Sequence, residues 1–220
     1  MQEIFKGNFT QQEPIPEDGI AAALDVMRSG RLHRYNLSPG ELGEVGLLER
    51  EFAAYVGSKY ALAVCSGGYA LATALRALDV KPGDKVLTNA FTLAPVPGSI
   101  ASVGAVPVFV GVTEDLVIDL DDLAEKAHLS NVLMLSHMRG HICDMDRLLE
   151  SCSEAGVKIV EDCAHTMGAA WRGVPSGRYG ASGCYSTQTY KHMNSGEGGF
   201  LVTDDDEIMA RATMLSGSYM

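Results

Sequence analysis

Three parts of the sequence carry groups that could hold and activate a small phosphorylated aldehyde. Lys191 offers an amine that can attack a carbonyl carbon. Asp162 closes the apolar run VKIVED and offers a carboxylate that can pair with a cationic ring nitrogen. Residues 65–69, CSGGY, pass from an apolar run into a helix-forming one, and the free N–H groups at such a junction bind phosphate.

An amine, a carboxylate and a phosphate cradle are what a site for pyridoxal 5'-phosphate (PLP) needs. The lysine bonds to the aldehyde, and the carboxylate keeps the pyridine nitrogen protonated so that the ring can withdraw electrons. Each part alone has an ordinary explanation, since most lysines lie on the surface and many strand-end aspartates sit in solvated turns. Together they predict a PLP site.

These residues have to be positioned by a sheet. Apolar runs bounded by turn residues alternate with helix-period segments, which is typical of parallel strands joined by helical crossovers. The expected strands are residues 61–64, 85–90, 106–112, 131–138, 157–163, 183–189 and 198–204. We therefore predict an α/β fold with a mostly parallel seven-stranded sheet and helices on both faces, whose ligand lies at the carboxyl ends of the strands.

The chain before the first strand has a different pattern. Residues 16–30 and 43–56 read as two helices joined by the polar loop GRLHRYNLSPGE. We expect an N-terminal helical segment with its loop over residues 1–56 and a cofactor-binding large domain over residues 57–220.

Composition narrows the class of protein. The net charge is −11 and no basic stripe is present, which argues against binding to a nucleic-acid backbone. No apolar run reaches the roughly 20 residues that cross a bilayer, and the first residues lack the pattern of a signal peptide. We expect a cytoplasmic protein with no nucleic-acid or membrane partner.

The five cysteines do not suggest metal or disulfide chemistry. Their number is odd and none falls in a CxxC pair. Cys65, Cys163 and Cys184 lie in or beside apolar runs, so we expect buried thiols and no metal site.

Taken in order, these residues resemble the DegT/DnrJ/StrS-type sugar aminotransferases, a branch of PLP enzymes of fold type I. The resemblance covers essentially the whole chain and includes the spacing of Asp162, His165, Ser186 and Lys191. The matching segments are SGGYAL, KPGDKVLTNAFT, VGAVPVFV, HMRGHICDMD, VEDCAHTMGA and the stretch from Ser186 through Lys191 to GEGG. No single motif is decisive, but their shared order is specific.

The resemblance implies catalytic roles for three residues. Lys191 would carry the Schiff base and move the proton during transfer, and Asp162 would pair with the pyridine nitrogen. His165 would contact the phenolic oxygen of the ring, or else is only a packed histidine. The segment around His137 is expected to be architectural, together with Gly140 and Asp144.

The resemblance also implies a binding surface. Ser186 and the backbone of Gly68 and Tyr69 would hold the cofactor phosphate. The stretch from Arg31 to Tyr35 lies where relatives contact substrate, although a solvated loop is an equal alternative.

Three departures from the family pattern bear on function. Leu93 stands where an aromatic residue usually stacks on the pyridine, so either Leu93 or Phe91 would cover the ring. Gly68 replaces a common threonine, which removes one hydroxyl from the phosphate cradle. The family's small C-terminal domain is absent, so the chain is a fragment, half of a split protein or a short form, and we favour a truncated form.

The resemblance implies an aminotransferase that moves an amino group from glutamate or glutamine to a keto-sugar, either nucleotide-linked or a keto-sugar acid. It also implies a homodimer that serves sugar biosynthesis, including cell-surface polysaccharide. A catalytically silent binding domain is one alternative. A sugar dehydratase is another, but such relatives replace the lysine by histidine, and Lys191 is present with His192 only as its neighbour.

Overall fold

The computed structural model describes residues 7–8, 14–32, 34, 37–38 and 40–217. The chain divides into two compact units, residues 1–33 and residues 34–220. In the first unit, helix α1 (Glu17–Ser29) ends at Gly30, whose left-handed backbone stops the helix. Of the loop expected to contact substrate, His33 and Tyr35 lie outside the described residues.

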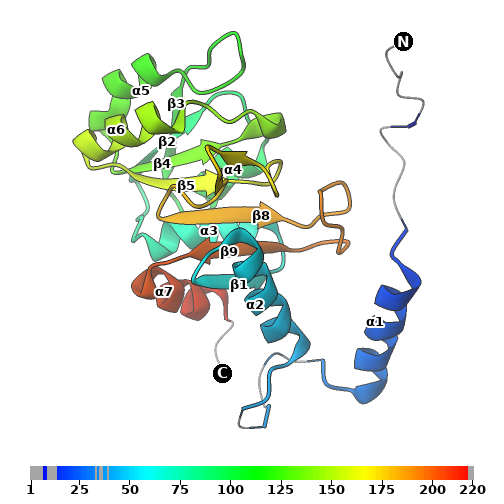
Figure 1. Cartoon of the computed structure of the whole chain (residues 1–220). Helices are drawn as coiled ribbons and strands as arrows, with labels where there is room; N and C mark the ends of the chain where they lie inside the picture. Colours follow the sequence, from blue (N-terminus) through cyan, green and yellow to red (C-terminus); the bar gives the residue numbers. More distant parts are fainter. Residues whose placement is uncertain (1–6, 9–13, 33, 35–36, 39, 218–220) are drawn as a thin grey trace. The chain divides into compact units, whose positions relative to one another are not determined.

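A seven-stranded sheet forms the centre of the second unit (Figure 1). Its strands are β1 (Tyr60–Val64), β2 (Lys85–Asn89), β3 (Val106–Val110), β4 (Val132–Ser136), β5 (Lys158–Asp162), β8 (Ser182–Ser186) and β9 (Gly199–Thr203). Their order is β1-β9-β8-β5-β4-β2-β3. Only β9 is antiparallel to its neighbours, so the predicted α/β fold with a mostly parallel seven-stranded sheet is confirmed.

The register brings several strand ends to one edge of the sheet. Ser136 at the end of β4 is paired with Asp162 at the end of β5. Ser186 at the end of β8 and Val64 at the end of β1 are both paired with Gly199, where β9 begins. The residues that end the parallel strands therefore share an edge with the loop that joins β8 to β9.

Helices cover both faces of this sheet, as the sequence pattern predicts. On one face, α3 (Gly67–Ala77), α4 (Pro95–Ser102) and α7 (Asp206–Ser216) pack on apolar strand residues such as Met134 and Leu201. On the other face, α5 (Leu120–Lys126) and α6 (Met145–Ala155) pack on residues such as Leu133 and Ile159. The central strands β4 and β5 are thus covered on both sides, which explains their continuous Val/Ile/Leu runs.

Helix α2 (Glu44–Val56) belongs to the second unit, although its residues read as part of an N-terminal segment in the sequence. Its Phe52 stacks on Phe200 of β9, with 3.9 Å between the ring centroids, and meets Tyr185 of β8 edge-on at 5.1 Å. This aromatic cluster covers the part of the sheet that lies next to β1.

Two details differ from the expectations. Cys65 is exposed rather than buried, because it follows the last residue of the edge strand β1 and precedes the first turn of α3. Cys163 and Cys184 are buried as expected. The second detail is a short hairpin that has no apolar signal in the sequence, β6 (Ala170–Trp171) with β7 (Val174–Pro175).

The remaining helical features follow local chemistry. Asp144 accepts hydrogen bonds from the N–H groups of Asp146 and Arg147 and so caps α6, in keeping with an architectural role. Among the described residues, no helix is both long and apolar enough to cross a membrane.

Candidate active site at the carboxyl edge of the sheet

Asp162 lies at the end of β5, where its carboxylate is fixed by two donors. Its Oδ2 accepts a hydrogen bond from Ser136 Oγ at 2.8 Å, and its Oδ1 accepts one from the N–H of Ala164 at 3.2 Å. Ser136 Oγ in turn accepts a hydrogen bond from Thr92 Oγ1 at 2.8 Å. The carboxylate therefore stands at the edge of the sheet at the end of a chain of two hydroxyl groups.

The buried side-chain amide of Asn89 holds the ends of β2 and β4 together next to these two hydroxyl groups. The Asn89 side chain donates to the carbonyls of Phe91 and Ser136 at 3.0 and 3.1 Å, and it accepts from the Ser136 N–H at 2.8 Å. Asn89 is 1% exposed, so these bonds are shielded from water. The loop that carries Thr92 is thereby held against the end of β4.

Lys191 lies on the loop that joins β8 to β9, at the same edge. Backbone hydrogen bonds from Thr187 to Gly198 and from Ser195 back to Thr187 close the base of this loop. The Lys191 amine is 2.7 Å from Nε2 of His165, which lies three residues beyond Asp162. The structure therefore brings Lys191 and His165 into direct contact beside Asp162.

The surroundings lower the pKa of both Lys191 and His165. Burial lowers the pKa of Lys191, which Asp162 partly offsets, while Arg139 lowers it further. Burial and the charge on Lys191 lower the pKa of His165 as well. The N–H of Arg139 donates to His165 Nδ1 at 3.2 Å, so the imidazole proton belongs on Nε2. Nε2 then donates to the amine, and this requires the free lone pair of a neutral lysine.

The first turn of α3 offers backbone N–H donors at the same edge, and we call this turn, together with Ser186, the cradle. Ser66 caps the helix by accepting a hydrogen bond from the Tyr69 N–H at 3.1 Å. The N–H groups of Gly67 and Gly68 have no partner within the helix, because the first turn of any helix leaves its donors free. A Cβ atom on Gly67 would approach Ser186 Cβ to 2.8 Å, so this turn lies directly against the end of β8.

The predicted phosphate ligands are thus not equivalent. Ser186 and the Gly68 backbone line the cradle, whereas the Tyr69 amide is already occupied by the Ser66 cap. The Ser186 hydroxyl accepts a bond from the Gln188 N–H at 3.3 Å, and its own proton remains available to an anion.

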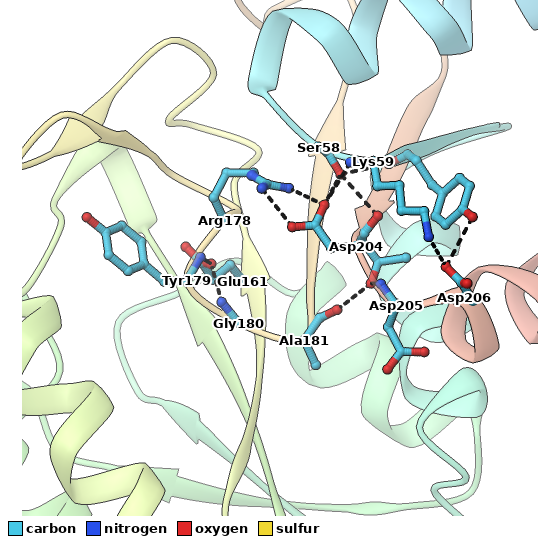
Figure 2. A network of polar contacts seen from close by, with 12 residues as sticks. Ser58, Lys59, Glu161, Arg178, Tyr179, Gly180, Ala181, Asp204, Asp205 and Asp206 are labelled. Carbon is cyan, nitrogen blue, oxygen red and sulfur yellow. Dashed lines mark hydrogen bonds and ion pairs between the residues drawn. The ribbon is translucent and has the colours of Figure 1, made fainter.

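Below the site, Glu161 anchors the segment that follows β7. It is completely buried, and its oxygens accept hydrogen bonds from the N–H groups of Gly177, Tyr179 and Gly180 and from His137 Nε2. Three backbone N–H donors and one imidazole nitrogen therefore surround the two buried oxygens of Glu161. Figure 2 shows it beside Tyr179 and Gly180.

The same segment is tied to the end of β9. Arg178 makes a two-pronged ion pair with Asp204, with both N–O distances 2.8 Å. Asp204 also accepts a bond from the Lys59 N–H at 2.7 Å, and these donors lower its pKa to about 2. Figure 2 shows this network joining residues before β1, before β8 and after β9.

One buried group of possible metal ligands occurs among the described residues, formed by His137, Glu161 and Cys163. The Glu161 oxygens are already saturated by N–H donors. Burial also raises the pKa of the Cys163 thiol well above its usual value, which opposes formation of the thiolate that a metal binds.

Sequence reasoning missed several residues that shape the site. Ser136 and Asn89 end apolar strands, and a polar residue in that position was the available signal. Arg139 contributes through its backbone, which adopts a left-handed conformation (φ 56°) that the sequence does not announce. Leu93 is 43% exposed at the start of α4, so its side chain is open to a ligand or a partner.

Comparison with known proteins gives evidence that is independent of the site geometry. Residues 15–218 match the model of the DegT/DnrJ/EryC1/StrS aminotransferase family. The L-glutamine:scyllo-inosose aminotransferase of Streptomyces griseus is 35% identical over 210 residues, which are 92% of this chain and 48% of that protein.

Solved structures agree. The aminotransferase from Psychrobacter cryohalolentis matches with a TM-score of 0.85 and 30% identity, over 93% of this chain and 51% of that one. The PLP form of the sugar aminotransferase Spr1654 from Streptococcus pneumoniae matches with a TM-score of 0.80 and 26% identity, over 92% and 54%. The chain spans about half the length of these proteins. With sequence, fold and family model in agreement, the chain belongs to the DegT/DnrJ/EryC1/StrS aminotransferase family.

Proposed function

We propose that this chain forms the PLP-binding part of an aminotransferase that transfers an amino group from glutamine or glutamate to a keto-sugar. The observation that carries the proposal is the placement of Lys191, His165 and Asp162 at one sheet edge, with the amine 2.7 Å from the imidazole. A helix N-terminus with free N–H groups opens at the same edge.

The groups present fit PLP by their chemistry. When bound, PLP supplies an aldehyde for an amine and a ring that withdraws electrons from the carbon attached to nitrogen. Lys191 is the amine at this edge, and Asp162 is an acceptor suited to a protonated ring nitrogen. The N–H groups of Gly67 and Gly68, with the Ser186 hydroxyl, suit the phosphate dianion.

Lys191 and His165 then divide the proton chemistry. Burial lowers the pKa of Lys191, which favours the neutral amine that acts as a nucleophile and as a base. The Nε2 proton of His165 stabilises whichever electron-rich atom faces it, which is the amine in this structure. Asp162, held by Ser136 and Ala164, contributes a fixed negative charge.

Names of relatives guide the choice of substrate. The relative from Streptomyces griseus is named for L-glutamine and scyllo-inosose, and a matching structure is named as the PLP form of a sugar aminotransferase. These names support glutamine as donor and a cyclic keto compound of the sugar type as acceptor. The loop from Arg31 to Tyr35 is proposed to contact the acceptor.

The proposal extends to assembly and location. A homodimer is supported by exposed apolar side chains next to the site, namely Leu93 at 43% and Tyr190 at 61%. Sedimentation of the purified chain at several concentrations tests this part. Synthesis of amino sugars for cell-surface polysaccharide in the cytoplasm is the setting that we propose for such a reaction.

The direct test follows absorbance after PLP is added and then glutamine. The unchanged chain is expected to develop a visible band with PLP, which bleaches when glutamine donates its amino group. Lys191→Ala should develop no such band. The control is Lys158→Ala, which changes an exposed lysine at the opposite end of β5 and should leave the band as in the unchanged chain. A chain that stays colourless in millimolar PLP would instead support a silent binding domain.

A further inference from the structure

The two hydroxyls behind Asp162 form a chain with only one possible direction. An ionised carboxylate has no proton to give, so the Ser136 hydroxyl must donate to Asp162 Oδ2. The Ser136 oxygen is then free to accept, and the Thr92 hydroxyl supplies that proton. Ser136 is 5% exposed, which keeps water from replacing either bond.

These bonds fix the plane of the Asp162 carboxylate. Ser136 Oγ holds Oδ2 and the Ala164 N–H holds Oδ1, so rotation about the side-chain bonds would break one of them. Ser136 itself cannot shift, because the Asn89 side chain bonds to both its N–H and its carbonyl. Each carboxylate oxygen keeps a further lone pair that points away from these donors.

We propose that Ser136 and Thr92 are positioning residues, which hold the Asp162 carboxylate in the plane that meets the pyridine nitrogen of PLP. This inference rests on the proposed function, because it assigns the carboxylate a ring nitrogen as its ligand. Ser136 fixes the carboxylate directly, and Thr92 acts through Ser136.

The chain contains matched control hydroxyls. Ser182 and Thr88 are 1% and 0% exposed, and both lie on strands of the same sheet. Among the described residues, the side-chain oxygens of both are buried without a hydrogen-bond partner. Ser182→Ala and Thr88→Val therefore remove the same atoms as Ser136→Ala and Thr92→Val, without removing a bond to the site.

The first experiment uses the cofactor-free chain and a double-mutant cycle. Ser136→Ala is expected to lower the Tm, and this loss should shrink when Asp162→Ala is already present. The effect of Ser182→Ala should be the same in both backgrounds. If the effects of Ser136→Ala and Asp162→Ala simply add, the two side chains are not coupled and the inference is overturned.

The second experiment reads the ring nitrogen itself. Nitrogen NMR of isotopically labelled PLP, bound to the chain, follows the protonation of the pyridine nitrogen as pH rises. In Ser136→Ala this nitrogen should lose its proton at lower pH, because the carboxylate is free to turn away. PLP should bind roughly tenfold more weakly. Thr92→Val should change both quantities in the same direction but less, and the two control variants should leave both unchanged.

The outcomes separate the inference from the function on which it rests. If the unchanged chain binds PLP and Ser136→Ala gives the same nitrogen titration and affinity, the inference fails and the proposed function stands. If the unchanged chain takes up no PLP, the proposed function fails, and the ring-facing role of the hydroxyls fails with it. Both the inference and the proposed function are supported if the effects of Ser136→Ala and Asp162→Ala are not additive and if the pyridine nitrogen of Ser136→Ala loses its proton at lower pH.

Discussion

At the scale of single residues, the site depends on two side chains whose pKa values are both lowered. Lys191 and His165 share one hydrogen bond, and burial lowers the pKa of each. Such a pair is costly for stability and useful for chemistry, because the uncharged form of an amine is the nucleophile. The N–H of Arg139 completes the arrangement by fixing which imidazole nitrogen carries the proton.

The lowered pKa predicts that Lys191 loses its proton below the ordinary lysine value of 10.5. Lys59 is the internal comparison, since its hydrogen bond to Asp206 raises its pKa above that value. Reductive methylation with labelled formaldehyde gives each lysine an NMR signal whose shift can be followed with pH. Lys191 should titrate at lower pH than Lys59. The reverse order would contradict the account of the pair.

Two adjacent glycines should respond in opposite ways to substitution. Gly67→Ala puts a methyl group 2.8 Å from Ser186 Cβ, so the first turn of α3 and the end of β8 must separate. We expect a loss of about 1–3 kcal/mol in the free energy of unfolding. A Cβ on Gly68 meets nothing closer than 3.8 Å, so Gly68→Ala should gain about 0.5–1 kcal/mol.

Denaturant unfolding of both variants checks this pair. Equal effects at the two positions would mean that the cradle is not packed against β8.

At the scale of elements, the site exists because strands of one sheet end together. The ends of β4 and β5 place Ser136 next to Asp162, and the antiparallel β9 returns the chain so that the loop with Lys191 lies at the same edge. Glu161 then fixes the segment between β7 and β8 with three accepted hydrogen bonds. A network of this kind is stable only while every partner is present.

Glu161→Gln tests that anchor. A glutamine amide turns one acceptor into a donor that faces backbone N–H groups, so at least one buried donor loses its partner. The free energy of unfolding should fall by about 3 kcal/mol, measured by denaturant titration against the exposed Glu150→Gln, which should change little. If the two variants lose the same stability, the buried carboxylate is not the anchor.

Most of the strands could be predicted from the sequence. Each of the seven strands was expected within a few residues of its observed bounds, because buried parallel strands are continuous apolar runs. The hairpin of β6 and β7 could not be predicted, since two-residue strands carry no periodicity. Cys65 was wrongly expected to be buried, because a run of apolar neighbours does not reveal where an edge strand ends.

The sequence singles out Asp162, His165 and Lys191 by type and spacing, and Ser186, Gly68 and Tyr69 by resemblance. Ser136 and Thr92 were missed, because they matter only through contacts between segments far apart in the chain. The left-handed backbone at Arg139 is likewise a tertiary property.

At the scale of the whole molecule, this chain covers about half the length of the relatives that it matches. The residues proposed to bind PLP all fall within its second unit, from the first turn of α3 to the loop before β9. We therefore propose that Lys191, and no other lysine, is the residue to which a bound aldehyde is joined.

Borohydride trapping tests this claim most directly. The chain is incubated with PLP, reduced so that any carbon–nitrogen double bond becomes permanent, and digested for mass spectrometry of the labelled peptide. The account predicts a single phosphopyridoxyl group, on Lys191, at stoichiometric PLP. A label spread over surface lysines such as Lys59 and Lys158, with Lys191 unmodified, would contradict it.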